Sequence, residues 1–190
     1  MKAIIVPIFK KKREINEIEN YRPISLTKVN RKIFEALILQ MSNKFIALGI
    51  NQGGFRTRRG TFDQVICLDE YIKRLKRKNQ ERIVAFLDIQ KAYDSVDREI
   101  LWLKLNKKGL SNNIMKIFRS LFDYNQIQVL VDGRLSKGLK LPMGLLQGSI
   151  LSPILYASFI DDICENNNNN NSTKMLLYAN DIAICDKNEQ

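Results

Sequence analysis

The chain has 190 residues, of which 45% are hydrophobic and 27% charged, and this composition excludes a wholly disordered protein. It contains no histidine, which excludes histidine-based catalytic triads and histidine-ligated zinc sites. The net charge of +11 arises in residues 1–82, which hold 19 Lys and Arg against 8 Asp and Glu, because residues 83–190 hold 12 of each sign. This distribution fits a surface that faces nucleic acid, and it fits a merely solvated basic face equally well.

Cysteine usage and hydropathy indicate the cellular setting. Cys67, Cys164 and Cys185 lie far apart without metal-ligand spacing, so we expect reduced, buried thiols and an intracellular protein. No run of 18 or more apolar residues is present, so no membrane partner is expected. The short apolar run at the N-terminus contains Pro7 and predicts a strand, not a secretory signal.

The first part of the chain predicts two strands and then two helices. Residues 3–9 and 22–27 have the pattern of short strands on either side of a basic, polar loop. Residues 28–48 carry apolar side chains at the spacing of an amphipathic helix. These side chains are Val29, Ile33, Phe34, Leu37, Ile38, Met41 and Phe45. Thr61 to Gln64 has the form of a capping box and opens a helix to about Lys78. That helix is expected to bury Val65, Leu68, Ile72 and Leu75.

The second part alternates helices with hairpins. Residues 83–87 predict a buried strand that ends at Asp88, and Asp97 and Ser111 are expected to cap two helices. Residues 150–165 predict an apolar helix. Two hairpins are expected, residues 127–131 with 135–141 and residues 175–178 with 182–185. The asparagine tract 166–171 predicts a surface loop insertion, and the abrupt end after the last strand predicts a truncated domain. Helices mixed with antiparallel hairpins indicate an α+β fold.

Asp88 is the first candidate for chemistry. It follows an apolar strand within the segment Phe86 to Asp97, so its carboxylate is expected at the rim of a sheet. Hard oxygen ligands in that position suit Mg²⁺, which also binds substrate phosphates. The alternative is that Asp88 only caps the following turn, and the segment taken alone favours this alternative.

The turn Asn180-Asp181 is the second candidate. It lies between two apolar strands, where Asn and Asp are common for purely local reasons. With Asp88, however, it places a second acidic strand end in the same chain. Two-metal phosphoryl transfer needs carboxylates from separate segments that are brought within a few ångströms of each other. The two segments together therefore suggest a shared metal site.

Two further segments could contact a ligand. In residues 144–153, glycines flank Gln147 and permit close backbone approach to a ligand, although a helix-entry loop without a ligand has the same composition. Lys10 to Arg13 and Arg22 suit a triphosphate, with a solvated loop as the competing explanation for the lysines. Arg22 is less easily explained in this way, because it precedes Pro23 in an apolar strand.

In their order along the chain, these segments resemble the reverse-transcriptase family over about residues 4–184. The nearest likeness is to polymerases of non-long-terminal-repeat (LINE-like) retrotransposons, and group II intron reverse transcriptases are a more distant comparison. Five segments carry the resemblance, and their order makes it specific. They are Asn20 to Thr27, Gln52 to Arg56 with Thr61, Phe86 to Val96, Gln147 to Pro153, and Tyr178 to Asp181.

The resemblance implies a right-hand polymerase with fingers in residues 1–82, a palm in residues 83–190, and no thumb. The implied activity is RNA-directed DNA synthesis with two Mg²⁺ ions, or Mn²⁺, on an RNA template with a DNA primer and deoxynucleoside triphosphates. For a eukaryotic retrotransposon the implied location is the nucleus. The sequence gives no oligomeric state.

The resemblance also implies roles for individual residues. Asp88, Asn180 and Asp181 match the metal-binding catalytic positions. Tyr93 matches the steric gate that rejects a ribose 2′-hydroxyl. Three further residues match nucleotide contacts: Gln147 and Gly148 in the pocket, and Arg22 at the triphosphate, assisted by a lysine among residues 10–12.

The sequence departs from the family pattern at Asn180, which stands where the catalytic turn usually has its first aspartate. An amide brings no negative charge, so we expect a loss of several kcal/mol of transition-state stabilisation. That corresponds to about a thousandfold or more in rate. Leu146 also replaces the usual proline before Gln147. We therefore expect a fragment of a decayed mobile element whose catalysis is impaired.

Three alternatives remain open at this point. The first is a catalytically inactive nucleic-acid-binding remnant of such a domain. The second is an RNA-dependent RNA polymerase, against which Tyr93 argues because a bulky gate disfavours ribonucleotides. The third is a structural α+β domain in which the motifs are coincidental, and it requires five coincidences in the correct order.

Overall fold

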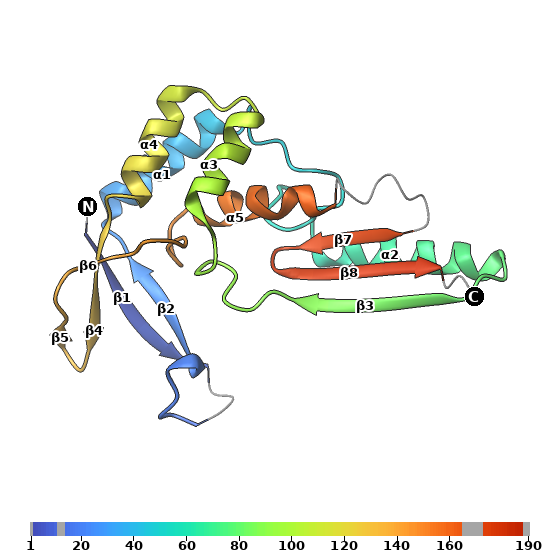
Figure 1. Cartoon of the computed structure of the whole chain (residues 1–190), viewed down its shortest axis with the longest axis horizontal. Coiled ribbons are helices and arrows are strands. Elements are labelled where there is room, and N and C mark those ends of the chain that lie inside the picture. Colours follow the sequence, from blue (N-terminus) through green and yellow to red (C-terminus); the bar gives the residue numbers. More distant parts are fainter. Residues whose placement is uncertain (1, 11–13, 165–172, 188–190) are drawn as a thin grey trace. The chain divides into compact units, whose positions relative to one another are not determined.

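The computed structural model describes residues 2–10, 14–164 and 173–187. The chain forms two compact units, each built from two stretches that are remote in the sequence (Figure 1). The first unit comprises Met1–Ile46 and Tyr93–Ser152, and the second comprises Ala47–Ala92 and Pro153–Gln190. The predicted loop insertion at residues 166–171 lies outside the described residues.

The first unit contains a mixed sheet. Its strands are β1 (Lys2–Phe9), β2 (Tyr21–Leu26), β4 (Gln126–Val131), β5 (Arg134–Leu135) and β6 (Leu139–Lys140). They follow the order β2-β1-β4-β5, and β6 also pairs with β4. The hairpin expected over residues 127–141 is antiparallel, and so is the pair β1–β2. By contrast, β1 and β4 pair in parallel, with Ala3 opposite Ile127. This parallel pair buries Ala3, Ile5, Ile127 and Leu146 together.

In its described residues, the first unit also contains three α-helices and one short 3₁₀ turn. They are α1 (Val29–Ser42), α3 (Arg98–Lys107), α4 (Asn112–Phe122) and the turn η1 (Ile18–Asn20). Trp102 on α3 packs against Phe118 and Phe122 on α4, with ring centroids 6.3 Å apart in both pairs. The predicted caps are confirmed, because the Asp97 side chain accepts from the backbone of Glu99 and Ile100, and Ser111 accepts from Ile114.

Helix α1 is inverted relative to an ordinary amphipathic helix, which turns its apolar side to the core. Its buried side chains are Arg31, Glu35, Ile38 and Ser42. Its exposed side chains include Val29, Ile33, Phe34, Leu37 and Met41. The sequence pattern therefore predicts the helix correctly, but most of the apolar side chains that define the pattern face outward.

The second unit contains an antiparallel sheet in the order β3-β8-β7, formed by β3 (Arg82–Asp88), β7 (Lys174–Tyr178) and β8 (Asp181–Lys187). Helix α2 (Thr61–Arg77) packs against β7 and β8 (Figure 1). Helix α5 (Ser152–Ile160) starts at the last residue of the first unit and continues into the second, where the 3₁₀ turn η2 (Asp161–Ile163) follows it.

Four expectations for the second unit need correction. Strand β3 is not buried, because it lies at the edge of its sheet, and Phe86 is 73% exposed. Helix α2 is capped at Gly60, not Thr61; the Gly60 N–H donates to the Asp63 carboxylate, and glycine has no side chain to return the contact. Val65 is exposed because it lies on the outer side of α2. Cys67 is free but exposed, whereas Cys164 and Cys185 are free and buried.

The remaining composition-based expectation concerns membranes. Among the described residues, no helix has the length and apolar character needed to cross a bilayer.

The inversion of α1 gives a direct stability test. Leu37 is 56% exposed and its chain neighbour Ile38 is 5% exposed. We expect Ile38→Ala to lower the free energy of unfolding by about 2–5 kcal/mol, because it leaves a cavity. Leu37→Gln should change it by less than about 0.5 kcal/mol. Urea denaturation of the two variants measures the difference, and a larger loss from Leu37→Gln would contradict the inverted packing.

Candidate functional site

Asp88 and Asp181 are brought together by strand pairing. Asp88 is the last residue of β3, and Asp181 is the first residue of β8. The two residues are direct partners in the antiparallel register. Directly opposed side chains of such a pair lie on the same face of a sheet, with Cβ atoms about 4.5–5.5 Å apart. Both side chains are exposed, so the two carboxylates stand side by side at an accessible end of the sheet.

The turn that precedes Asp181 is tight. Tyr178 pairs with Asp181, so only Ala179 and Asn180 connect β7 to β8. Ala179 has a φ of +56°, in the left-handed region that residues with a Cβ atom rarely adopt. A backbone conformation of this kind persists only where its surroundings impose it.

Asn180 links the turn to the opposite strand. Its Nδ2 donates to Oδ1 of Asp88 at 2.6 Å, and its backbone carbonyl accepts from the N–H of Ile89 at 3.0 Å. The Asn180 side chain therefore lies against the Asp88 carboxylate. A second carboxylate in its place would repel Asp88 unless a cation stood between them, whereas the amide donates a hydrogen bond.

The donors at this end of the sheet fit a divalent cation in type. Carboxylate and amide oxygens are the hard ligands that Mg²⁺ prefers. The described ranges contain no group of three or more acidic, cysteine or histidine side chains that could hold a metal ion, and beside Asp88 and Asp181 stands the amide of Asn180, whose Nδ2 faces Asp88. The set therefore supplies two negative charges, one fewer than a set of three carboxylates.

Tyr93 and Gln147, the candidates for nucleotide contact, lie in the first unit. The Tyr93 carbonyl accepts from the N–H of Leu145 at 2.8 Å. Gln147 Nε2 reaches the carboxylate oxygens of Asp94 at 3.4 and 3.5 Å. The segment after Tyr93 and the segment before Gln147 are therefore held side by side. Burial raises the pKa of Tyr93, so its hydroxyl stays protonated at neutral pH.

Gly148 packs closely against the backbone of β2, whereas the sequence suggested close approach to a ligand. Its φ is +118°, and a Cβ atom there would lie 2.5 Å from the carbonyl oxygen of Ser25. The Ser25 N–H donates to the Gln147 carbonyl at 2.6 Å, which fixes this segment against β2. The glycine is thus required by the fold, whatever ligand the neighbouring side chains contact.

The basic candidates are only partly described. Arg22 is exposed on β2, three residues before Ser25. Lys10 Nζ donates to the Glu19 carbonyl at 2.8 Å. Residues 11–13 lie outside the described ranges.

Sequence reasoning missed a buried ion pair that anchors the segment after Gln147. Arg31 Nε contacts Glu35 Oε1 at 2.6 Å, and both side chains are almost fully buried. The other Glu35 oxygen accepts from the Ser149 hydroxyl and the Ile150 N–H, each at 2.8 Å. Arg31 also donates to Asn125 Oδ1. The available signal was an Arg and a Glu four residues apart, a spacing that usually indicates a solvated pair.

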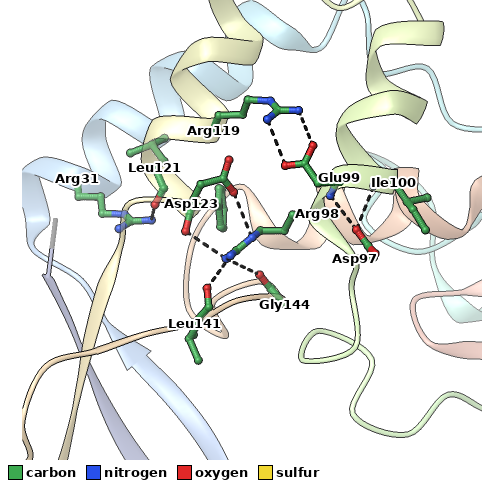
Figure 2. A network of polar contacts seen from close by, with 11 residues as sticks. Arg31, Asp97, Arg98, Glu99, Ile100, Arg119, Leu121, Asp123, Leu141 and Gly144 are labelled. Carbon is green, nitrogen blue, oxygen red and sulfur yellow. Dashed lines mark hydrogen bonds and ion pairs between the residues drawn. The ribbon is translucent and has the colours of Figure 1, made fainter.

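Arg98 anchors the chain before Gln147 in the same way (Figure 2). It donates to the Leu141 carbonyl at 2.6 Å and the Phe122 carbonyl at 3.1 Å, and it pairs with Asp123 at 3.2 Å. Burial lowers the pKa of Arg98 and raises the pKa of Asp123. An arginine side chain remains a cation even so. By contrast, the Arg119–Glu99 pair in the same figure is exposed.

The chain matches one family over nearly its whole length. Residues 9–190 match the family described as reverse transcriptase (RNA-dependent DNA polymerase). The chain is 30% identical over 194 residues to the RNA-directed DNA polymerase from mobile element jockey of Drosophila funebris, covering 98% of this chain and 21% of that protein. It is 30% identical over 190 residues to the probable RNA-directed DNA polymerase from transposon BS of Drosophila melanogaster, covering 96% and 21%. The chain thus spans about a fifth of the length of these relatives.

Solved structures share its fold. Apo telomerase from Candida tropicalis aligns with a TM-score of 0.72 and 12% identity, covering 98% of this chain and 39% of that one. A form of it truncated from the C-terminal domain aligns with a TM-score of 0.69 and 15% identity, covering 99% and 44%. At these identities the likeness concerns the fold alone.

The buried ion pair of α1 yields a second stability prediction. Removing one partner of a buried pair leaves an uncompensated charge, so Glu35→Ala should lower the free energy of unfolding by about 3–5 kcal/mol. Glu99→Ala, which breaks the exposed pair with Arg119, should cost at most about 1 kcal/mol. Equal losses in urea denaturation would show that Glu35 is not buried as described.

Proposed function

Because the chain belongs to the reverse transcriptase (RNA-dependent DNA polymerase) family, we propose that it supplies the fingers and palm of a retrotransposon polymerase. The reaction is template-directed addition of deoxynucleotides to a DNA primer on an RNA template. By motif order along the chain, residues 1–82 are assigned to the fingers and residues 83–190 to the palm. The single observation that supports this proposal most is the direct pairing of Asp88 with Asp181 beside Asn180.

Asp88 and Asp181 are the proposed metal ligands, with the amide oxygen of Asn180 as the third. A bound pair of Mg²⁺ or Mn²⁺ ions would lower the pKa of the primer hydroxyl and stabilise the charge on the leaving pyrophosphate. The sheet supplies positioning, because both carboxylates sit on paired strand ends whose register fixes their separation. Their exposure leaves room for a phosphate to approach.

Asn180 weakens this arrangement in two ways. It removes one negative charge from the donor set, and its Nδ2 occupies an oxygen of Asp88. To offer its own oxygen instead, the amide must turn about its last side-chain bond and give up that hydrogen bond. Both effects oppose cation binding, which supports the expectation of impaired catalysis.

The nucleotide is proposed to contact residues of the first unit. Tyr93 is the proposed steric gate against a ribose 2′-hydroxyl, and it suits this role as a half-buried ring anchored through its backbone. Gln147 and Gly148 are the proposed pocket for the incoming sugar and base, and Arg22 is proposed to bind the triphosphate. The buried Glu35 and Arg98 hold the segment that contains Gln147, so they support the pocket without touching the nucleotide.

The proposed partners are an RNA template, a DNA primer and deoxynucleoside triphosphates. The excess of 11 positive charges in residues 1–82 supports binding to nucleic-acid backbones without reading sequence. A nuclear site of action is proposed for a eukaryotic retrotransposon of this type.

A second function is favoured by one specific contact. The hydrogen bond from Asn180 to Asp88 places a neutral donor where a third carboxylate would need a cation beside it. A protein that has lost catalysis but keeps its basic surface would bind template and primer without extending them.

Primer extension separates the two functions. We expect Asn180→Asp to extend a DNA primer on an RNA template on the order of a thousandfold faster than the natural chain, because it restores a charged ligand. Single-turnover rates measured with Mg²⁺ and with Mn²⁺ give the comparison. The matched control is Asn113→Asp, which adds the same charge on an exposed position of α4 and should leave the rate unchanged.

The outcomes are distinct. Equal and robust extension by the natural chain and by Asn180→Asp would refute impaired catalysis. Loss of the gain in the double variant Asp88→Asn with Asn180→Asp would tie the activity to this site. If neither chain extends the primer but both bind a labelled RNA–DNA duplex in a salt-dependent manner, the binding remnant is the correct function.

A further inference from the structure

Residues 49–56 include the family-like segment Gln52 to Arg56, and they run alongside the strand that leads into the β7–β8 turn. Gln52 forms a parallel bridge with Leu177 on β7. The Leu177 N–H donates to the Asn51 carbonyl at 2.9 Å, and the Gly53 N–H donates to the Leu177 carbonyl at 2.8 Å. The segment therefore adds a single parallel bridge to the edge of β7, next to the β7–β8 turn.

The segment is fastened where it begins. The Gly49 N–H donates to both carboxylate oxygens of Asp161, at 2.9 and 3.1 Å, and Asp161 is buried. Arg56 Nη1 donates to the carbonyls of Gly49 and Gln52, at 2.8 and 3.3 Å. These contacts make the segment a fixed support and not a loose loop.

Gly54 lies against the turn itself. A Cβ atom on Gly54 would overlap the backbone nitrogen of Ala179 and lie 3.0 Å from its Cα. Because both neighbours are backbone atoms, neither can move without displacing the turn. Gln52, only 1% exposed, accepts from the Gly54 N–H through Oε1 at 2.8 Å and so fixes the glycine in this place.

The supported residue is the strained one. Ala179 holds a left-handed conformation, which a residue with a Cβ atom keeps only where its surroundings impose it. Backbone contact with Gly54 on one side and pairing of Tyr178 with Asp181 on the other supply these surroundings. The direction in which Asn180 and Asp181 leave the turn depends on this conformation.

We propose that Gln52 and Gly54 are positioning residues that set the geometry of the Ala179–Asn180 turn and so aim Asn180 and Asp181 at Asp88. They act through backbone contact and touch neither metal nor substrate. This inference rests on the proposed function for its consequence, which is cation binding, but the geometric part stands on the contacts alone.

The test compares two glycines in otherwise identical chains. A Cβ atom from Gly54→Ala cannot fit against Ala179 unless the backbone shifts, whereas Gly138→Ala meets only Gln126 Oε1 at 3.7 Å, an ordinary contact. Both substitutions are made in the natural chain and in Asn180→Asp. Amide NMR spectra report changes in the conformation of the turn. Titration with Mn²⁺ measures the affinity of the folded protein for this ion.

Gly54→Ala is expected to shift the amide signals of residues 178–181, and Gly138→Ala is expected to leave them in place. In the Asn180→Asp background, Gly54→Ala should weaken Mn²⁺ binding by about 10–100-fold, as residues that orient metal ligands typically do. A purely structural role would lower the melting temperature but leave the Mn²⁺ affinity of the folded protein unchanged.

Each remaining outcome decides one point. Unshifted turn amides in Gly54→Ala overturn the inference, whether or not Mn²⁺ binds. Shifted amides without any Mn²⁺ binding by Asn180→Asp count against the proposed function and leave the positioning role intact. If Gly54→Ala does not fold, Gln52→Met takes its place, because it removes the hydrogen-bond acceptor for the Gly54 N–H at similar side-chain volume. Gln52→Met should shift the amide signals of residues 178–181 by less than Gly54→Ala. Unshifted signals in Gln52→Met would overturn the inference.

Discussion

The register between β3 and β8 is the constraint on which the candidate site depends. Side chains alternate between the two faces of a sheet, so a slip of one residue would send Asp181 to the face opposite Asp88. The observed pairing runs from Arg82 with Lys187 to Asp88 with Asp181, and it ends where the turn begins. Two acidic residues separated by most of the palm-like sequence become neighbours because one register is selected. The edge position of β3 leaves them accessible.

At this pair of carboxylates, Asn180 makes a hydrogen bond in the position where the family usually has a third carboxylate. Three carboxylates at one place require a cation, since like charges in proximity raise one another's free energy. With Asn180 the site holds two carboxylates and a donor, and the donor is already engaged with Asp88. Under the proposed function, this hydrogen bond is expected to weaken the affinity of the site for cations.

The two units support their functional segments by different means. In the first unit, the buried Arg98 holds the Leu141 carbonyl before Gln147. The buried Glu35, paired with Arg31, holds the Ile150 N–H after Gln147. In the second unit, backbone contacts dominate, with a glycine placed where no side chain fits. Buried charges hold a segment through directional bonds at a cost in desolvation, whereas backbone packing holds it by volume exclusion. Both devices fix short segments that local propensity alone would leave undetermined.

The sequence by itself determined the family, the α+β class, most helix and strand positions, and the residue types at Asp88, Asn180 and Asp181, because these follow from motif order and from local periodicity. It did not determine which side of a periodic pattern is buried: α1 conceals Arg31 and Glu35 and exposes Leu37, and β3 is an exposed edge. It gave no sign that residues 49–56 support the turn, nor that β1 pairs in parallel with β4. Periodicity is a property of one segment, whereas burial, register and backbone contact depend on what packs against it, and only the tertiary structure decides that.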